Sequence, residues 1–216
     1  AGRREDSLVL IIPMSAQLSV RSGAVDATRR AVKVLTKGLH TGVQAVSELD
    51  LSRLGSPRMV ILPSPGCLSD EAWRGLMEYV DRGGTLIATG VLERDPYLRL
   101  TSRLGEAGIP GLGPIPVAFQ ELLFMNGEQY LLTFSDLRQN WVEREAWTGE
   151  AIVWESRVGQ GNILYSPLPL ELADQFAPAV QLYRRGMELA GVEPELIIDD
   201  YIPTTFVRLL RFAEAD

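Results

Sequence analysis

Cys67 is the residue whose type and position in this sequence best suit catalysis. It follows the short apolar run 59–62 and comes just before a helix predicted to begin after Ser69. The N-terminus of a helix lowers the pKa of a nearby thiol, so a cysteine at this position could act as a nucleophile.

A cysteine nucleophile needs a base within about 3 Å, and the sequence contains one histidine, His40. His40 lies at the end of the first predicted helix. In a parallel sheet crossed by helices, that end is at the amino edge, whereas Cys67 is at the carboxyl edge, about 25 Å away along the helix. The sequence therefore predicts a small buried cysteine rather than a Cys/His dyad.

Three serines also lie at the ends of predicted strands, namely Ser15, Ser64 and Ser166. None of them is part of a G-x-S-x-G motif, and no second histidine is present to activate them. They are predicted to be turn residues. The glycines at 83–84 and at 159 and 161 match no nucleotide-binding motif and are predicted to form turns. We expect no catalytic residue, no cofactor site and no metal site in this chain.

Glu93 and Asp95 form a pair of carboxylates in the loop after a predicted strand. Two carboxylates in a crevice could supply the acid and the base of glycoside hydrolysis. A spacing of two residues within a loop is weak support for that role. Because acidic side chains are mostly exposed, the sequence favours a solvated loop.

Three of the four tryptophans lie close together in the sequence, and the resulting aromatic group is Trp141, Trp147, Trp154 and Tyr165. Aromatic faces can stack on sugars, which would make this chain a carbohydrate-binding module. Tryptophan is equally common in cores and at subunit interfaces, and the sequence favours packing or an interface.

The elements that must position these residues are clearest in residues 58–90. Residues 59–62 read as a buried strand, Ser69 as a helix N-cap, and residues 85–89 as a second strand. Between them Trp73, Leu76, Met77 and Val80 lie on one helix face, which must be buried. This segment predicts two parallel strands joined by a helix.

The rest of the chain extends this pattern. A strand at 8–12, a polar loop at 15–21, a helix capped by Ser22 and a strand at 43–47 precede the central unit. After it come a helical segment at 98–107, a hairpin around Asn126-Gly127, strands at 151–155 and 162–166, and a helix that Asp174 can cap. We predict an open α/β parallel sheet of flavodoxin-like type, with helices on both faces and a β-hairpin insertion.

Composition limits the possible partners and compartment. The 216 residues carry a net charge of −7, which disfavours nucleic-acid and membrane binding because both need a basic surface. One cysteine fits a reducing compartment, and the N-terminus is no signal peptide, so we expect a cytoplasmic protein.

Three stretches resemble one known family: TRRAVKVL at 28–35, LPSPGCLSDEAWRGLMEYVDRGGTLIATG at 62–90, and YSPLPLELAD at 165–174. They are similar to the β-galactosidase trimerisation domain of family 42 glycoside hydrolases. The resemblance implies a fold like that of class I glutamine amidotransferases without their catalytic triad. It also implies a catalytic TIM barrel before this domain and a small β domain after it. No barrel fits within 216 residues, so no catalytic residue is carried over.

The resemblance implies a domain organisation and a function. Residues 1–7 are expected to be a linker, 8–198 the trimerisation domain, and 199–216 a tail or the start of the following β domain. The chain is then a non-catalytic oligomerisation domain excised from a β-galactosidase-like parent. A glutaminase-like enzyme using Cys67 and a carbohydrate-binding module stay open as alternatives.

A homotrimer of the longer protein would need apolar surface beyond what the sheet buries. The sequence offers the loop 110–119 and the hairpin around Asn126-Gly127, which both lie outside the α/β repeat. The apolar residues expected there are Ile109, Leu112, Ile115, Val117 and Phe119. We expect the isolated chain to be a monomer or a weak oligomer.

Overall fold

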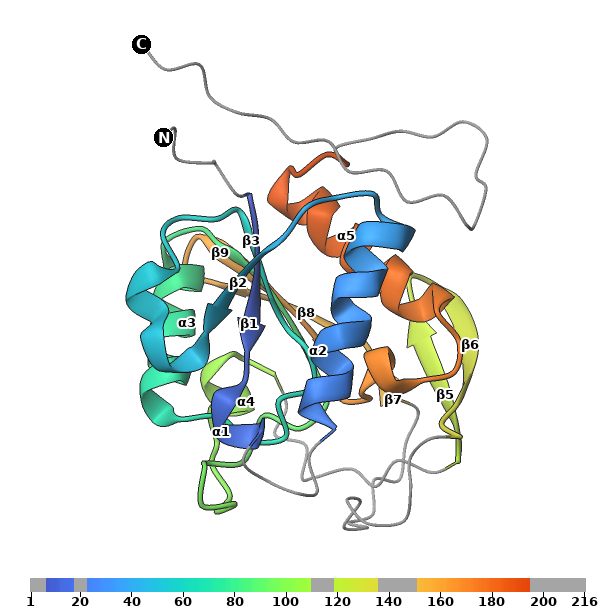
Figure 1. The fold of residues 1–216 in the computed structure, drawn as a ribbon, viewed down its shortest axis with the longest axis horizontal. Coiled ribbons are helices and arrows are strands. Elements are labelled where there is room, and N and C mark those ends of the chain that lie inside the picture. Colours follow the sequence, from blue (N-terminus) through green and yellow to red (C-terminus); the bar gives the residue numbers. More distant parts are fainter. Residues whose placement is uncertain (1–6, 18–22, 110–118, 136–150, 195–216) are drawn as a thin grey trace.

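A six-stranded sheet forms the centre of the computed structural model, which describes residues 7–17, 23–109, 119–135 and 151–194 (Figure 1). The strand order is β2-β1-β3-β4-β9-β8. The first five strands are parallel, and β8 pairs antiparallel with β9. The order of the parallel strands is that of flavodoxin-like folds, which confirms the predicted fold class. The bounds are β1 Leu8–Ile12, β2 Gln44–Ser47, β3 Met59–Leu62, β4 Thr85–Thr89, β8 Trp154–Val158 and β9 Gly161–Ser166.

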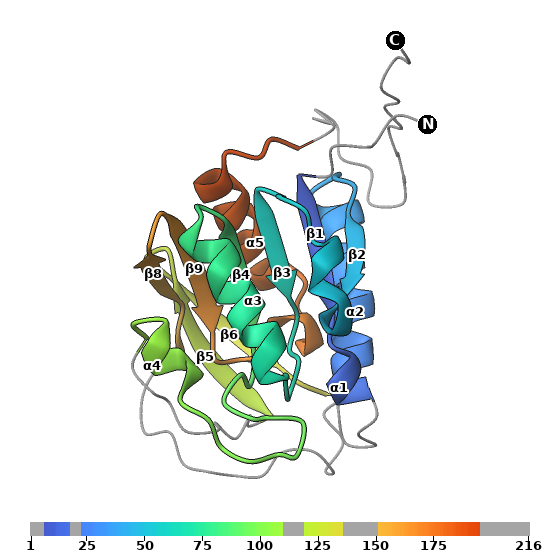
Figure 2. The same ribbon diagram turned by 90° about the vertical axis from the view of Figure 1, so that its left-hand side faces the viewer.

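Helices cover both faces of this sheet (Figure 2). Helix α2 (Ala24–Lys33), extended by a π-helical turn (Val34–Gly38), and α5 (Ala177–Ala190) share one core with Leu8 and Leu10 of β1. Helix α3 (Asp70–Asp81) packs on the other face with Val9 and Ile11. The central strands β1 and β3 are continuous apolar runs because both of their faces are buried.

The predicted unit at 58–90 is confirmed in detail. The Ser69 hydroxyl caps α3 by accepting the N–H of Ala72 at 3.1 Å. The helix buries Trp73, Leu76 and Val80 against the sheet, and β3 and β4 run parallel.

The predicted hairpin is also confirmed and forms a second, smaller sheet. Strands β5 (Gln120–Met125) and β6 (Glu128–Thr133) pair antiparallel, and β7 (Ala151–Ile152) pairs with β5. Asn126 and Gly127 have φ of 54° and 78°, the positive values that a two-residue type I′ turn requires. The hairpin is attached to the α2 and α5 side of the molecule because Leu123 and Leu132 are buried in that core.

Four predictions of local structure were wrong or only partly right. The polar loop at 15–21 begins with a short helix, α1 (Met14–Gln17). The helix expected over 98–107 is limited to α4 (Arg103–Glu106), because the preceding residues form a turn closed by an Arg94–Leu100 bridge. The strand at 151–155 is divided between the two sheets. Asp174 does not cap α5, because its carboxylate accepts the N–H and the hydroxyl of Ser135.

Three shorter features complete the description. The 3-10 turns are Glu48–Arg53 and Leu170–Leu172. Arg58 joins the two ends of the described fold, since its N–H donates to the carbonyl of Ser7 at 3.0 Å and its guanidinium to that of Gly191 at 2.8 Å.

None of the helices in the described part of the chain is long and apolar enough to cross a membrane. Ser22 and the tail at 199–216 lie outside the described residues.

One expectation about exposed surfaces is corrected. Ile109, which the sequence placed among the apolar residues available for subunit contacts, is buried in the core on the α3 face. Phe119 and the hairpin are exposed as expected, and residues 110–118 lie outside the described part.

Candidate functional site

A buried cluster of four side chains lies beyond the carboxyl ends of β3, β4 and β9, where ligands bind in open α/β sheets. Glu171 is at its centre. One carboxylate oxygen accepts the hydroxyls of Thr89 at 2.7 Å and Ser64 at 3.0 Å, and the other accepts the hydroxyl of Tyr183 at 2.6 Å. The N–H of Ser64 donates to the Thr89 hydroxyl at 3.0 Å. Two strand ends, the segment after β9 and α5 therefore converge on one carboxylate.

The backbone around Ser64 is shaped for this contact. Ser64 has φ of 39°, a left-handed conformation that is unfavourable for a residue with a Cβ atom. Pro63 and Pro65 flank it, and Gly90 approaches so closely that a Cβ atom at Gly90 would lie 3.3 Å from the Ser64 Cα. The close approach and the left-handed turn point the Ser64 hydroxyl toward Glu171.

A serine hydroxyl that is hydrogen-bonded to a carboxylate could act as a nucleophile with the carboxylate as its base. Here both groups are enclosed, since Ser64, Thr89, Glu171 and Tyr183 are all buried. Burial raises the pKa of the Glu171 carboxyl, although its hydrogen bonds act in the opposite direction. The arrangement connects four parts of the fold through one buried carboxylate.

Cys67 and His40 lie where the sequence predicts them. Cys67 follows β3 and is buried with Ala16 and Ala24, whereas His40 lies between the π-helical turn and β2, at the opposite edge of the sheet. Burial raises the pKa of the Cys67 thiol, and the nearby Glu48 carboxylate raises it further. Both effects oppose formation of a thiolate, so the environment of Cys67 does not favour the glutaminase-like alternative.

The other two serines have specific partners. Ser15 donates its hydroxyl to the buried carboxylate of Glu48, whose pKa burial raises, and this contact attaches α1 to the segment after β2. The hydroxyl of Ser166 donates to the carbonyl of Leu168 at 3.1 Å, in agreement with the predicted turn.

Glu93 and Asp95 do not lie in a solvated loop, and this prediction was wrong. Both side chains are buried because they bind the backbone of their own loop. Glu93 accepts the N–H of Leu104 at 2.8 Å. Asp95 accepts the N–H groups of Tyr97 and Arg99 and the Arg99 guanidinium, and these contacts lower its pKa. The two carboxylates shape the loop and do not face each other across an open crevice.

Arg103 supports this loop from the protein interior. Its side chain is 2% exposed, and its guanidinium donates to the carbonyls of Leu92, Arg94 and Leu68 at 2.9, 2.7 and 2.7 Å, and to Asp70 at 2.6 Å. One planar side chain therefore connects the loop after β4 to the start of α3.

Part of the predicted aromatic group is accounted for by packing. Trp154 and Tyr165 are directly opposite each other on β8 and β9. Tyr165 is buried and donates its hydroxyl to the carbonyl of Gly90 at 2.9 Å, and the half-buried Trp154 packs on the core of the α3 face. Trp141 and Trp147 lie outside the described residues.

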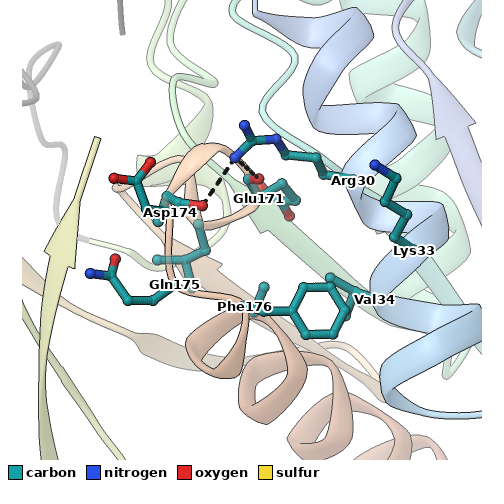
Figure 3. A pocket seen from close by; sticks show the side chains of 10 residues that line it. Arg30, Lys33, Val34, Glu171, Asp174, Gln175 and Phe176 are labelled. Atoms are coloured by element: carbon teal, nitrogen blue, oxygen red, sulfur yellow. Dashed lines mark hydrogen bonds between the residues drawn. The ribbon is translucent and has the colours of Figure 1, made fainter. Parts of the chain in front are cut away.

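An open pocket of about 360 Å³ lies between α2 and the segment before α5 (Figure 3). Arg30 extends over it and donates to the carbonyls of Glu171, Leu172 and Ala173 at 3.4, 3.2 and 3.0 Å. Gln175 binds the backbone and the hydroxyl of Thr133, and Phe176 with Val34 forms an apolar wall. Arg30 and Gln175 thereby attach the segment before α5 to α2 and to β6.

Sequence reasoning missed Thr89, Glu171, Tyr183 and Arg103. One signal was present for Glu171, which is an acidic residue inside the otherwise apolar run 168–173 directly after a strand. In the described part of the chain, no group of three or more His, Cys, Asp or Glu side chains could hold a metal ion.

Comparison with solved structures identifies similar folds in larger enzymes. A catalytic mutant of Gan42B, a GH42 β-galactosidase from G. stearothermophilus, is 17% identical with a TM-score of 0.60, over 90% of this chain and 31% of that one. The β-galactosidase from Bacillus circulans sp. alkalophilus is 14% identical with a TM-score of 0.60, over 92% and 33%. The exo-β-1,4-mannosidase Op5Man5 from Opitutaceae bacterium strain TAV5 is 14% identical with a TM-score of 0.51, over 85% and 35%.

These likenesses show a shared α/β fold, and this chain spans about a third of the length of each of those proteins. No family model matches the sequence, and no curated protein matches it.

Proposed function

We propose that this chain is a non-catalytic structural domain of a multidomain glycoside hydrolase, with a β-galactosidase-like parent. The observation that carries the proposal is that nearly the whole chain superimposes on about a third of GH42 β-galactosidases. In such a parent, chemistry belongs to a separate catalytic barrel, and the domain at 8–198 serves assembly into a trimer.

The residues at the carboxyl edge support a structural role. Ser64 and Glu171 are enclosed, the pKa of Cys67 is raised, and Glu93 and Asp95 bind backbone N–H groups. The burial and contacts of these five residues support a structural role for each of them.

Glycosidase assays of this chain with aryl galactosides, arabinosides and glucosides test the first half of the proposal. We expect no rate above the blank. A rate that disappears in Glu93→Gln or Asp95→Asn while the fold is kept would overturn the non-catalytic role.

Light scattering tests the second half, using this chain and a longer polypeptide that includes the catalytic barrel. We expect a monomer or weak oligomer for the chain and a trimer for the longer protein. A longer protein that is monomeric at micromolar concentration would remove the assembly role and leave the fold assignment intact.

A further inference from the structure

Helix α1 helps to cover the thiol of Cys67 at the carboxyl edge of the sheet. Ala16 of α1, Ala24 at the start of α2 and Cys67 form a small apolar cluster that is separate from the two main cores. Figure 1 draws α1 at the end of β1, beside the start of α2. Cys67 is 3% exposed in this position, so a reagent reaches its thiol only when part of the cover moves away.

One polar side-chain contact attaches α1 to the rest of the fold. The helix is a single turn of four residues, and its described contribution to the apolar interior is Ala16. The hydroxyl of Ser15 donates to the carboxylate of Glu48, directly after β2. A single turn that buries so little apolar surface opens at a lower free energy than the whole domain unfolds. The Ser15–Glu48 hydrogen bond is therefore a large part of what holds α1 in place.

The carboxylate of Glu48 is buried and only half satisfied. Glu48 is 3% exposed, its Oε1 accepts the Ser15 hydroxyl, and its Oε2 has no hydrogen-bond partner of good geometry among the described residues. A buried polar atom without a partner destabilises the fold, and it does so more strongly when the group is charged. The closed position of α1 therefore tolerates the protonated carboxyl better than the carboxylate.

The groups that face Glu48 do not remove this preference. Burial raises the pKa of the Glu48 carboxyl and outweighs the hydrogen bonds of Ser15, the N–H of Ser69 and the charge of Arg103, which all lower it. These groups come from α1 and from the starts of α3 and α4. Cys67 faces the same carboxyl from the segment after β3, and a charge on Glu48 raises the pKa of its thiol.

We infer that ionisation of Glu48 releases α1 and exposes the Cys67 thiol to modification. In the open form water hydrates the carboxylate, which the closed form leaves incompletely satisfied. The pKa of Glu48 in the closed form is raised above its ordinary value of 4.5. The stabilisation that this carboxyl gives the closed form is therefore fully present below about pH 4.5 and is lost as pH rises through the folded-state pKa. The open form stays a small fraction, so the thiol reacts more slowly than in the unfolded chain.

This inference goes beyond the proposed role in a glycoside hydrolase and does not depend on it. It makes Cys67 a thiol whose modification is controlled by pH through a neighbouring carboxyl as well as through its own ionisation.

The pH dependence of thiol labelling tests the inference, because Cys67 is the one cysteine of the chain. 4,4′-Dithiodipyridine forms a mixed disulfide with the thiolate and releases thiopyridone, so its rate with an accessible thiol rises about tenfold per pH unit below the thiol pKa. Opening linked to Glu48 adds up to about a further tenfold per unit between pH 4.5 and the folded-state pKa. We expect a steeper rise for the wild type than for Glu48→Gln in this range, and equal slopes above it.

Two further variants keep the test independent of any one substitution. Glu71→Gln, at an exposed position in the first turn of α3, is the matched control and should keep the wild-type slope. Ser15→Ala removes the donor that holds α1, so it should raise the labelling rate several-fold below about pH 5, where the wild type is closed. Far-UV circular dichroism shows whether each variant is folded, and Ser15→Ala gives a result even if Glu48→Gln does not fold.

Urea separates the opening of α1 from global unfolding. Ionisation of the buried Glu171 also favours unfolding as pH rises, and an unfolded chain exposes Cys67 as well. Opening of one helical turn exposes little surface, so the labelling rate should change little with urea below the unfolding transition. A rate that rises with urea as steeply as unfolding itself would overturn the inference.

Two other results would contradict it. A wild-type slope equal to that of Glu48→Gln throughout the pH range would show that Glu48 does not control access to the thiol. A steep slope that persists in folded Glu48→Gln would assign the opening to another titrating group.

Discussion

Glu171 organises one edge of the sheet through its hydrogen bonds. Three hydroxyls converge on its carboxylate, from residues 64, 89 and 183. Burying a carboxylate lowers the stability of the fold unless hydrogen bonds satisfy it, so loss of one donor is expected to be destabilising. The cluster therefore links the ends of β3 and β4 to α5 through one charge-bearing group.

Glu171→Gln tests the direction of the pKa shift. The carboxyl pKa in the folded state is raised above 4.5, its ordinary value. The stabilisation that the wild-type carboxyl contributes is therefore fully present below about pH 4.5 and is lost as pH rises through the folded-state pKa. Glutamine does not ionise, so the unfolding free energy of the variant relative to wild type should rise with pH, by about 1.4 kcal/mol for each unit of pKa difference.

Urea unfolding at several pH values between 4 and 8 measures this trend. Glu71→Gln, at an exposed position in the first turn of α3, is the matched control and should show no such rise. A constant difference between Glu171→Gln and wild type across the range would contradict a raised pKa.

A second prediction at this scale concerns the reactivity of the Cys67 thiol. Its thiol is 3% exposed and its pKa is raised, so both access and thiolate fraction are low. Labelling with iodoacetamide at pH 7.5 should be slow in the folded protein and fast in urea. A thiol-reactive glutamine analogue that modifies the folded protein at neutral pH within minutes would revive the glutaminase-like alternative.

At the scale of elements, the loop after β4 depends on Arg103. Its guanidinium donates to three carbonyls and one carboxylate from a position almost without solvent. Lysine keeps the charge but has no planar fork, so Arg103→Lys leaves two or more of these acceptors unsatisfied. We expect the unfolding free energy to fall by about 2 to 4 kcal/mol.

Arg99→Lys is the matched control, since Arg99 belongs to the same loop and its side chain is 73% exposed. Its effect should stay within about 1 kcal/mol, as for other surface ion pairs. Equal losses for the two variants in chemical denaturation would show that Arg103 is not the main support of the loop.

The elements were more predictable from the sequence than the site. The spacing of Trp73, Leu76 and Val80 and the turn at Asn126-Gly127 are local signals, and the structure confirms both. The contacts of Glu171 with Ser64 and Thr89 join residues 107 and 82 positions apart. The periodicity of the sequence does not indicate that these three residues meet. Only the order of the strands in the sheet brings them together.

The same reasoning explains the errors at Asp95 and Asp174. Acidic residues next to a turn or a helix suggest a solvated loop or a cap, and either interpretation uses only neighbouring residues. In the structure Asp174 binds Ser135, 39 positions away. Asp95 is buried because its loop turns back on itself at the Arg94–Leu100 bridge and its carboxylate binds the N–H groups of Tyr97 and Arg99, whereas the sequence placed residues from 98 onward in a helix.

For the whole molecule, the contacts of Arg58 have a consequence for chain connectivity. Because one arginine binds both Ser7 and Gly191, the first strand begins next to the place where the last helix ends. The fold should therefore tolerate circular permutation. A short glycine-rich linker from residue 194 to residue 7, with new termini between Asn126 and Gly127, should give a cooperative thermal transition and native circular dichroism. A permutant opened inside β3 is the control that should not fold. The same adjacency means that a polypeptide joined to both ends of this fold would enter and leave it at one edge of the sheet.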